Sequence, residues 1–387
     1  MSSEFGLQPL NDSFLHKLAH HIAPVSLHPF LRRNIITHHR DFDVLLKALE
    51  EKKPLYIYTG RGPSSASMHL GHLVPFLFTR YLQQSLRSPV VIQITDDEKF
   101  LFRGVELSVV EKNAQENIKD IMACGFDPDQ TFVFQNTKYI QALYPNILRI
   151  QSKITNSQCF ATFGIKPENN IGQTAFCAIQ AAPAFASSFA HLDANALCLI
   201  PCGIDQDPYF RLTRDVAPKL GYAKPLLLCS EFLPSLKGVN EKMSSTVPDS
   251  AIFLTDTPTQ IASKIKKSFS GGQVSKQDQL DKGADLSVDV AYQYLRFFLE
   301  DDAELDRITQ YYGPDPQYKP KMMCSDVKKR AIEVVTEVIQ RLQVRRDGAP
   351  SVALISPSVV HEKLNSVDDG TESHLDEKAL IASVVLL

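Results

Sequence analysis

Two histidines three positions apart, in the segment HLGH at residues 69–72, are the first candidates for chemistry in this chain. They follow a short turn in which Arg61 lies between Gly60 and Gly62. Residues i and i+3 share one face of a helix, so a helix that begins here places both imidazoles beside the free N–H groups of its first turn, which attract anions. Glycine lets a ligand approach the main chain closely, and arginine binds phosphate or carboxylate bidentately. The pattern favours a nucleoside triphosphate site without a Walker loop over two surface histidines at a helix start.

A second candidate is the polar segment KMSST at residues 242–246. A lysine on a loop can act as a point charge on phosphates. A Lys-Met-Ser triplet alone is weak, because it matches many proteins by chance. Its combination with the histidine pair upstream makes it a specific indication of phosphate chemistry.

Alternating strands and helices are predicted to position both segments. The predicted strands are 54–59, 89–95, 131–134, 196–202 and 225–229, and helical patterns lie between them. This alternation predicts an α/β protein with a Rossmann-type, doubly wound parallel sheet. Ligands of such sheets bind at the carboxyl ends of the strands, which is where the first strand meets the HLGH segment.

The same patterns divide the chain into four parts. We expect N-terminal lead-in helices over 1–53, a Rossmann-type catalytic domain over 54–256 with a helical insertion at about 138–190, an α-helical domain over 257–364, and a tail over 365–387.

Composition narrows the class of protein. The net charge of −3 over 387 residues means that a nucleic acid must be met by local basic patches. The N-terminus has no secretory signal pattern, and no apolar run is long enough to span a membrane. Seven cysteines without a C-x-x-C pair favour reduced thiols in the cytoplasm and argue against a zinc site.

These segments resemble a known family. HLGH and KMSST are similar to the HIGH and KMSKS signatures of class I aminoacyl-tRNA synthetases. Four further stretches resemble the eukaryotic and archaeal tryptophanyl-tRNA synthetases, and the likeness runs from about residue 25 to about residue 350. They are YTGRGPSS at 58–65, TDDEK at 95–99, AIQAAP at 178–183 and GIDQDPYFRLTRDVA at 203–217.

The resemblance implies a reaction and a first set of residues. In this family the carboxylate of tryptophan attacks the α-phosphate of ATP, and the amino acid then passes from the adenylate to tRNA. Mg²⁺ would be carried by ATP oxygens and water. The implied catalytic residues are His69, His72, Lys242 and Arg61. The implied ATP-binding residues are Gly60, Gly71, Cys202, Gly203, Met243, Ser244 and Ser245.

The tryptophan-binding residues implied by the resemblance are Tyr58, Gln93, Glu98, Gln180 and Gln206. Indole has one N–H donor, which needs an acceptor when it is buried. Tyr58 and Gln93 match the residues that receive it in the family. An amide such as Gln93 inside an apolar strand must be satisfied, which itself favours a functional role.

The helical domain would bind the anticodon of tRNA(Trp), and its basic helix carries Lys264, Lys266 and Lys267. A solvated helix face is the equally simple alternative for these lysines. Gln273 and Val274 stand where eukaryotic members carry a charged pair, so the anticodon contacts stay open. The family also implies a homodimer, for which residues 138–163 are our candidate interface.

Three other functions compete with this interpretation. A tyrosine-specific synthetase would place a carboxylate opposite a phenol, whereas Tyr58 and Gln93 suit indole better. An inactive paralogue that senses tryptophan or binds tRNA would not need both phosphate signatures. Another HxGH nucleotidyltransferase, making a small-molecule adenylate, would not need the helical domain.

Overall fold

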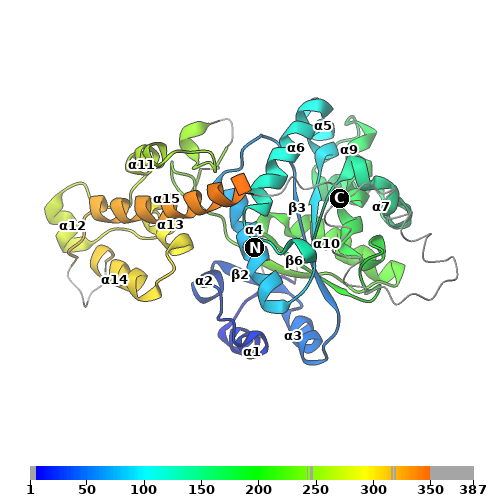
Figure 1. Ribbon diagram of the computed structural model, residues 1–387, viewed down its shortest axis with the longest axis horizontal. Coiled ribbons are helices and arrows are strands. Elements are labelled where there is room, and N and C mark those ends of the chain that lie inside the picture. Colours follow the sequence, from blue (N-terminus) through cyan, green and yellow to red (C-terminus); the bar gives the residue numbers. More distant parts are fainter. Residues whose placement is uncertain (1–5, 242, 245–246, 315–316, 318–319, 349–387) are drawn as a thin grey trace.

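A computed structural model describes residues 6–241, 243–244, 247–314, 317 and 320–348. Its centre is a seven-stranded sheet with the order β1-β2-β7-β6-β3-β4-β5 (Figure 1). The strands are β1 Gln8–Pro9, β2 Ile36–Arg40, β3 Leu55–Arg61, β4 Val90–Ile94, β5 Thr131–Gln135, β6 Leu197–Gly203 and β7 Leu226–Ser230.

The five strands from β3 to β7 are parallel and coincide with the five predicted from the sequence. From β3 the chain moves outward through β4 to β5, and then returns to the other side of β3 as β6 and β7. The direction of winding therefore reverses between β3 and β6. Ligands of doubly wound sheets bind at the carboxyl ends of the strands at such a switch point.

The N-terminal prediction needs a correction. We expected only lead-in helices over residues 1–53, but this part also contributes β1 and β2, which are antiparallel to each other, with β2 antiparallel to β7. The strand was missed because β2 has the sequence ITHHR, which does not read as apolar. Two of its buried polar side chains make contacts outside the strand. His39 Nδ1 accepts the Phe42 N–H, and Arg40 makes a buried ion pair with Asp207 at 2.6 Å.

Helices cover both faces of the sheet and form a separate cluster beside it (Figure 1). The helices preceding β6 are α1 Asp12–Ile22, α2 Pro29–Arg32, α3 Phe42–Glu50, α4 Leu70–Leu86, α5 Asp96–Arg103, α6 Leu107–Met122, α7 Asn136–Gln151, α8 Asn156–Phe163 and α9 Ile171–Ala181. Those following it are α10 Asp207–Val216, α11 Pro258–Lys267, α12 Lys276–Lys282, α13 Val290–Phe298, α14 Asp302–Tyr312 and α15 Cys324–Gly348.

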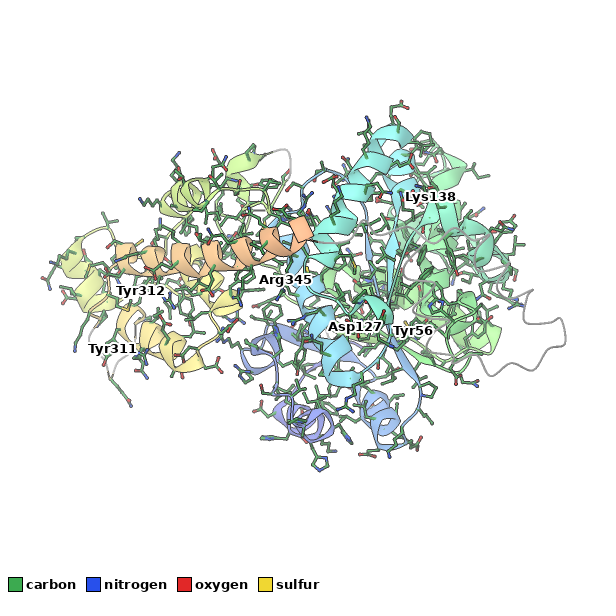
Figure 2. All side chains as sticks on the ribbon, in the orientation of Figure 1. Tyr56, Asp127, Lys138, Tyr311, Tyr312 and Arg345 are labelled. Atoms are coloured by element: carbon green, nitrogen blue, oxygen red, sulfur yellow. The ribbon has the colours of Figure 1, made fainter. Side chains whose placement is uncertain are left out.

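Each face of the sheet has its own apolar core. Alternate residues of β3 point to opposite faces, so Leu55 and Ile57 join one core while Tyr56 and Tyr58 join the other. The first core continues into the helical cluster, where it includes Leu295 of α13 and Val335 of α15. Side chains fill the space between these elements (Figure 2). The helices α11–α15 thus share one apolar core with the sheet.

The insertion after β5 consists of α7, α8 and α9, with no strand among its described residues. Our proposed domain division places this insertion within the catalytic domain and begins the helical domain at residue 257. The predicted tail at 365–387 lies outside the described residues. None of the helices in the described part of the chain combines the length and apolar character that a bilayer crossing requires.

Candidate active site

The histidine pair lies at the start of α4, beside the switch point of the sheet. His69 is the N-cap residue of α4, with an extended backbone and a side chain that makes no capping hydrogen bond. The rings of His69 and His72 stack with centroids 3.5 Å apart and an angle of 20° between their planes. The shared helix face predicted from their spacing is therefore present.

Three buried polar atoms meet at this place without a partner. Among the described residues, Nη2 of Arg61 and the Nδ1 atoms of His69 and His72 are buried and make no hydrogen bond. Buried polar groups are normally paired, so this concentration indicates a place where a polar ligand binds. Nε of Arg61 donates to Oδ1 of Asn117 at 3.0 Å, which anchors the guanidinium while its Nη2 stays available.

Burial fixes the protonation of these groups. It lowers the pKa of His69 to about 4, with the positive charge of Arg61 acting in the same direction. Burial also lowers the pKa of His72 far below its usual range, again with help from Arg61. Both imidazoles are therefore neutral at pH 7, so each carries one ring N–H donor, while Arg61 supplies a positive charge.

This burial predicts a loss of stability in acid. The pKa of His69 is about 4 in the folded protein and near 6.5 in the unfolded chain, so protons favour the unfolded state. The contribution of His69 to the free energy of unfolding is lost as the pH falls from about 6.5 to about 4, by up to about 3 kcal/mol. Urea unfolding between pH 7.5 and 4.5 measures it. The wild-type curve should fall more steeply than that of His69→Asn, whereas substitution of the exposed His16 should change nothing. Parallel curves for wild type and His69→Asn would contradict the prediction.

The KMSST segment contacts the HLGH segment, and we call these two the phosphate segments. A Cβ atom placed on Gly71 would lie 2.9 Å from Sδ of Met243 and 3.2 Å from Nδ1 of His69, so these side chains pack closely on Gly71. The main-chain N–H of Ser244 donates to Oγ of the buried Ser250 at 3.1 Å. Lys242 and Ser245 lie outside the described residues. The segments predicted to act together are thus adjacent at Gly71 and Met243.

Main-chain hydrogen bonds join the two segments as well. Leu70 N–H donates to Ile252 O at 2.9 Å, and Leu254 N–H donates to Met68 O at 2.9 Å. These bonds pair the residues around His69 with the chain that follows the KMSST loop. Phe253, at the centre of this pairing, sets its ring edge-on to that of His69. The phosphate segments are therefore held in one local structure.

Two strands carry glycines near their carboxyl ends, and both glycines are closely packed against neighbouring groups. A Cβ atom on Gly203, at the end of β6, would lie 3.0 Å from the Phe232 ring. A Cβ atom on Gly60, near the end of β3, would lie 3.3 Å from the carbonyl oxygen of Gln93. Cys202 has its Sγ 4.0 Å from Sγ of Cys229. These close neighbours favour glycine at both strand ends.

The candidate tryptophan pocket contains a chain of buried hydrogen bonds. The Tyr58 hydroxyl donates a hydrogen bond to Oε1 of Gln93 at 2.6 Å. It also lies 3.1 Å from the main-chain oxygen of Gln180. Nε2 of Gln93 donates to Oδ1 of Asn136 at 2.9 Å, and Gln93 is only 1% exposed. The bond to Asn136 orients the amide so that its oxygen faces Tyr58. The Tyr58 hydroxyl oxygen and Oε1 of Gln93, both able to accept hydrogen bonds, are therefore held side by side in the protein interior.

Asp97 is the last member of this series of hydrogen bonds, and it was not among the site residues predicted from the sequence. Its Oδ1 accepts from Nδ2 of Asn136 at 2.8 Å. Burial raises the pKa of Asp97 to about 6, opposed by the hydrogen bond from Asn136. The carboxylate fixes the orientation of the Asn136 amide and, through it, that of Gln93. Asp97 belongs to the TDDEK segment, so the signal was present, whereas Asn136 and Asn117 gave none.

Two other predicted tryptophan-binding residues, Glu98 and Gln206, do not take part in this series of hydrogen bonds. Glu98 pairs with Lys99 at 2.6 Å, and its Oε2 would be 2.6 Å from a Cβ atom on Gly62. Gln206 ends the short 3₁₀ turn Ile204–Gln206 after β6. The next residue, Asp207, is the one held by Arg40. Glu98 thus lies beside the glycine turn, and Gln206 beside the end of β6.

The three lysines predicted to bind tRNA are in different surroundings. Nζ of Lys264 pairs with Asp256 at 2.6 Å, and the Lys264 side chain is only 12% exposed. Lys266 and Lys267 are exposed on α11. The structure therefore leaves two of the three accessible to a phosphate backbone. Gln273 donates to Gly283 O at 2.8 Å, while Val274 is fully exposed.

The fold and the site together define a class of protein. The family model described as tRNA synthetases class I (W and Y) matches residues 50–340. The chain therefore belongs to the class I tRNA synthetases, and it is an aminoacyl-tRNA ligase.

Relatives narrow the class further. The chain is 46% identical over 343 residues to the cytoplasmic tryptophan–tRNA ligase of Arabidopsis thaliana, covering 87% of this chain and 84% of the relative. It is 48% identical over 326 residues to the cytoplasmic tryptophan–tRNA ligase of Homo sapiens, covering 82% and 68%. A crystal structure of Plasmodium falciparum tryptophanyl-tRNA synthetase superimposes with a TM-score of 0.84 at 43% identity, covering 90% of this chain and 93% of that one.

Proposed function

We propose that this site activates L-tryptophan with ATP and transfers it to tRNA(Trp), releasing AMP and pyrophosphate. The observation that carries the proposal is the juxtaposition of two features along β3. The buried Tyr58–Gln93 pair offers acceptors for an indole N–H, and Arg61, whose buried Nη2 has no partner, lies three residues after Tyr58. An amino acid bound by the first feature has its carboxylate near a phosphate bound by the second. The relatives are cytoplasmic enzymes, and we assign the same compartment to this chain.

Adenylate formation requires positioning and charge stabilisation more than covalent chemistry. We assign the triphosphate to the start of α4, where the neutral His69 and His72 donate hydrogen bonds and Arg61 neutralises charge. The attacking carboxylate oxygen forms a bond to the α-phosphorus as the bond to the bridging oxygen of pyrophosphate breaks. We assign to Lys242 the stabilisation of the departing pyrophosphate, with Ser244 and Ser245 as hydrogen-bond donors.

We assign the adenine and ribose of ATP to the main chain near the switch point of the sheet. Gly60, Gly71 and Gly203 are our candidate contacts there, and the main chain of Cys202 and Gly203 would meet the edge of the adenine. Class I synthetases use ATP with Mg²⁺. Among the described residues no group of three His, Cys, Asp or Glu side chains could hold a metal ion. We therefore assign Mg²⁺ to the ATP oxygens and water, where it would neutralise phosphate charge.

We base the recognition of tryptophan on the single N–H donor of its indole ring. The indole N–H would donate to the side-chain oxygens of Tyr58 and Gln93. Hydrogen bonds from Gln93 to Asn136 and from Asn136 to Asp97 hold the Gln93 amide in place. Glu98, Gln180 and Gln206 remain our candidates for the α-ammonium and α-carboxylate. A pocket that buries such acceptors rejects amino acids that leave them unpaired.

Charging of tRNA tests the complete function. Purified protein, ATP, Mg²⁺ and radiolabelled tryptophan should charge a tRNA(Trp) transcript, and labelled tyrosine with tRNA(Tyr) should give no product. Charging of tRNA(Tyr) alone would instead establish the tyrosine-specific alternative. Adenylate formation without any charging would favour the alternative of a nucleotidyltransferase acting on small molecules.

We also propose that the enzyme is a homodimer joined through α7. Two large apolar side chains on this helix, Tyr144 and Leu148, are 53% and 48% exposed. They lie four residues apart and therefore share one face of the helix. Such a face is typical of a subunit interface. It falls within the candidate region 138–163.

Light scattering coupled to size-exclusion chromatography tests the dimer. Wild type should elute with twice the 43.3 kDa mass of one chain. Tyr144→Glu combined with Leu148→Glu should shift the protein to the monomer mass, because two charges would be buried at the interface. The exposed Val344, on α15, provides the control as Val344→Glu. A wild-type monomer, or a dimer that survives the double substitution, would contradict the proposed interface.

A further inference from the structure

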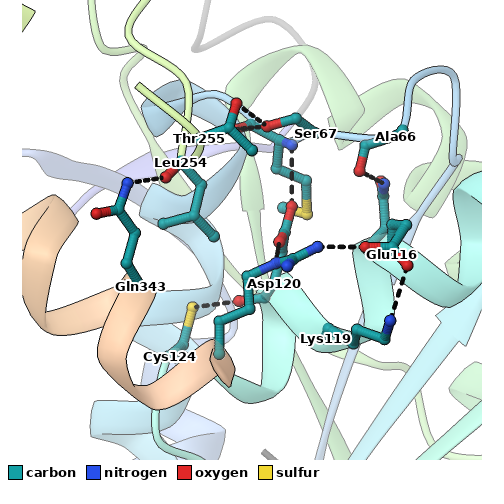
Figure 3. Close-up of polar contacts among 12 residues, drawn as sticks. Ala66, Ser67, Glu116, Lys119, Asp120, Cys124, Leu254, Thr255 and Gln343 are labelled. Atoms are coloured by element: carbon teal, nitrogen blue, oxygen red, sulfur yellow. Dashed lines mark hydrogen bonds and ion pairs between the residues drawn. The ribbon is translucent and has the colours of Figure 1, made fainter. Parts of the chain in front are cut away.

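The last turns of α15 leave the helical cluster and reach the sheet domain. Figure 1 shows this long helix running from the far side of that cluster to the neighbourhood of α4 and α6. Figure 2 marks Arg345 at its end, close to these two helices. The side chains there make polar contacts with the part of the chain that carries the phosphate segments (Figure 3).

Asp120 of α6 is the centre of the first contact. Its Oδ1 accepts from Nε of Arg346 at 2.6 Å, and its Oδ2 accepts from the main-chain N–H of Met68 at 3.0 Å. Arg346 also pairs with Glu116, one turn earlier on α6. The Asp120 side chain is only 1% exposed. One buried carboxylate therefore joins α15 to the residue directly preceding His69.

Gln343 makes the second contact, one turn before Arg346 on α15. Its Nε2 donates to the main-chain oxygens of Leu254 at 2.7 Å and Asp256 at 3.1 Å. Leu254 is the residue whose N–H donates to Met68 O at 2.9 Å. Figure 3 shows the Gln343 side chain joined to Leu254, and Asp120 nearby. Both sides of the joined phosphate segments are thus attached to the same helix.

We propose that Arg346 and Gln343 are positioning residues for adenylate formation, which hold the His69 turn and the chain after the KMSST loop in their working register. The inference rests on the proposed role of the histidine pair in binding ATP. Neither side chain touches the partnerless atoms of Arg61, His69 and His72. Each acts through another group, Asp120 or the main chain of Leu254. Movement of α15 within the helical domain would consequently change the phosphate site.

The chemistry of the two contacts sets the choice of variants. Arg346→Gln removes the positive charge from the buried Asp120, and it disturbs the bond to Met68. Arg346→Lys keeps a charged donor and should restore much of the loss. Gln343→Leu keeps the volume but removes both hydrogen bonds. The matched control is Arg341→Gln on the same helix, because Arg341 is 49% exposed and pairs only with surface glutamates in the described structure.

Pyrophosphate exchange, tryptophan binding and thermal unfolding are measured on each variant. We expect Arg346→Gln and Gln343→Leu to lower kcat by about 10- to 100-fold, as small displacements of reacting groups do. The dissociation constant of tryptophan should stay within about twofold, because the Tyr58–Gln93 pocket is not attached to α15. Arg346→Lys should recover most of kcat, and Arg341→Gln should match wild type.

Two results would overturn the positioning role. One is a kcat within about twofold of the control for folded Gln343→Leu and Arg346→Gln. The other is a parallel loss of kcat, tryptophan binding and thermal stability that Arg346→Lys does not relieve, because that pattern indicates general destabilisation. If Arg346→Gln fails to fold, Gln343→Leu and Arg346→Lys decide the question. Wild type is measured in the same assay, so absence of its exchange would count against the proposed function and not only against the positioning role of Arg346 and Gln343.

Discussion

Replacement of His72 by alanine is expected to lower kcat for tryptophan-dependent pyrophosphate exchange by about 10²- to 10³-fold. This is the size of effect that follows when one preorganised donor to a developing charge is removed. The neutral ring of His72, stacked on His69, would donate to the phosphate in the transition state. Lys242→Ala should give a loss of similar size for the same reason. Tryptophan binding, followed separately, should survive in both variants.

A matched control separates this effect from a general effect of removing a histidine. His16 is exposed on α1, so His16→Ala should keep wild-type kcat. Thermal unfolding of His72→Ala should show a folded protein. A kcat for His72→Ala within about threefold of wild type would remove the histidine pair from the assigned chemistry.

Replacement of Gln93 by leucine is expected to lower kcat/KM for tryptophan by about 10- to 100-fold. The variant removes an acceptor for the indole N–H and leaves Asn136 without its donor, a loss of about 1–3 kcal/mol. Because the chain contains no tryptophan, the fluorescence of added tryptophan reports binding directly. The dissociation constant measured in this way should rise together with KM.

An analogue of tryptophan makes this test specific for the indole N–H. Wild type should strongly prefer tryptophan over the analogue in which sulfur replaces the ring N–H, and Gln93→Leu should largely lose that preference. Gln83→Leu is the control, since Gln83 is a buried glutamine that donates to Gln130 O and Thr131 far along α4. An unchanged preference in Gln93→Leu would show that Gln93 does not receive the indole N–H.

The central sheet could be predicted because its strands carry strong local signals. Strands β3 to β7 are short and mostly apolar, and helical patterns separate them, so both their positions and their parallel order follow from the sequence. Strand β2 could not be predicted in this way. Nδ1 of His39 accepts from Phe42 N–H, and Arg40 pairs with Asp207, which lies 167 positions away. A pattern confined to one segment does not contain such long-range pairing.

The candidate site shows the same division. His69, His72 and the glycines form a local pattern, and the contact between Gly71 and Met243 agrees with the pairing of the two segments. No signal in the sequence indicated Asn117, Asn136 or the positioning residues Gln343 and Arg346 on α15, because a polar residue on an amphipathic helix looks like solvated surface. Only the packing of α6, α7 and α15 against the sheet reveals what these side chains hold. Lys264 illustrates the reverse, since its place in a basic run concealed the pair with Asp256.

The most direct test of the central claim is pyrophosphate exchange by wild-type protein with tryptophan and tyrosine offered in parallel. The assigned site predicts rapid exchange with ATP and tryptophan, and exchange with tyrosine lower by several orders of magnitude, because a phenol leaves the indole acceptors mispaired in a pocket shaped for a larger ring. Exchange with tyrosine that equals or exceeds that with tryptophan would contradict the account. Tight binding of tryptophan with no exchange at all would contradict it as well, since the protein would then be a sensor and not a ligase.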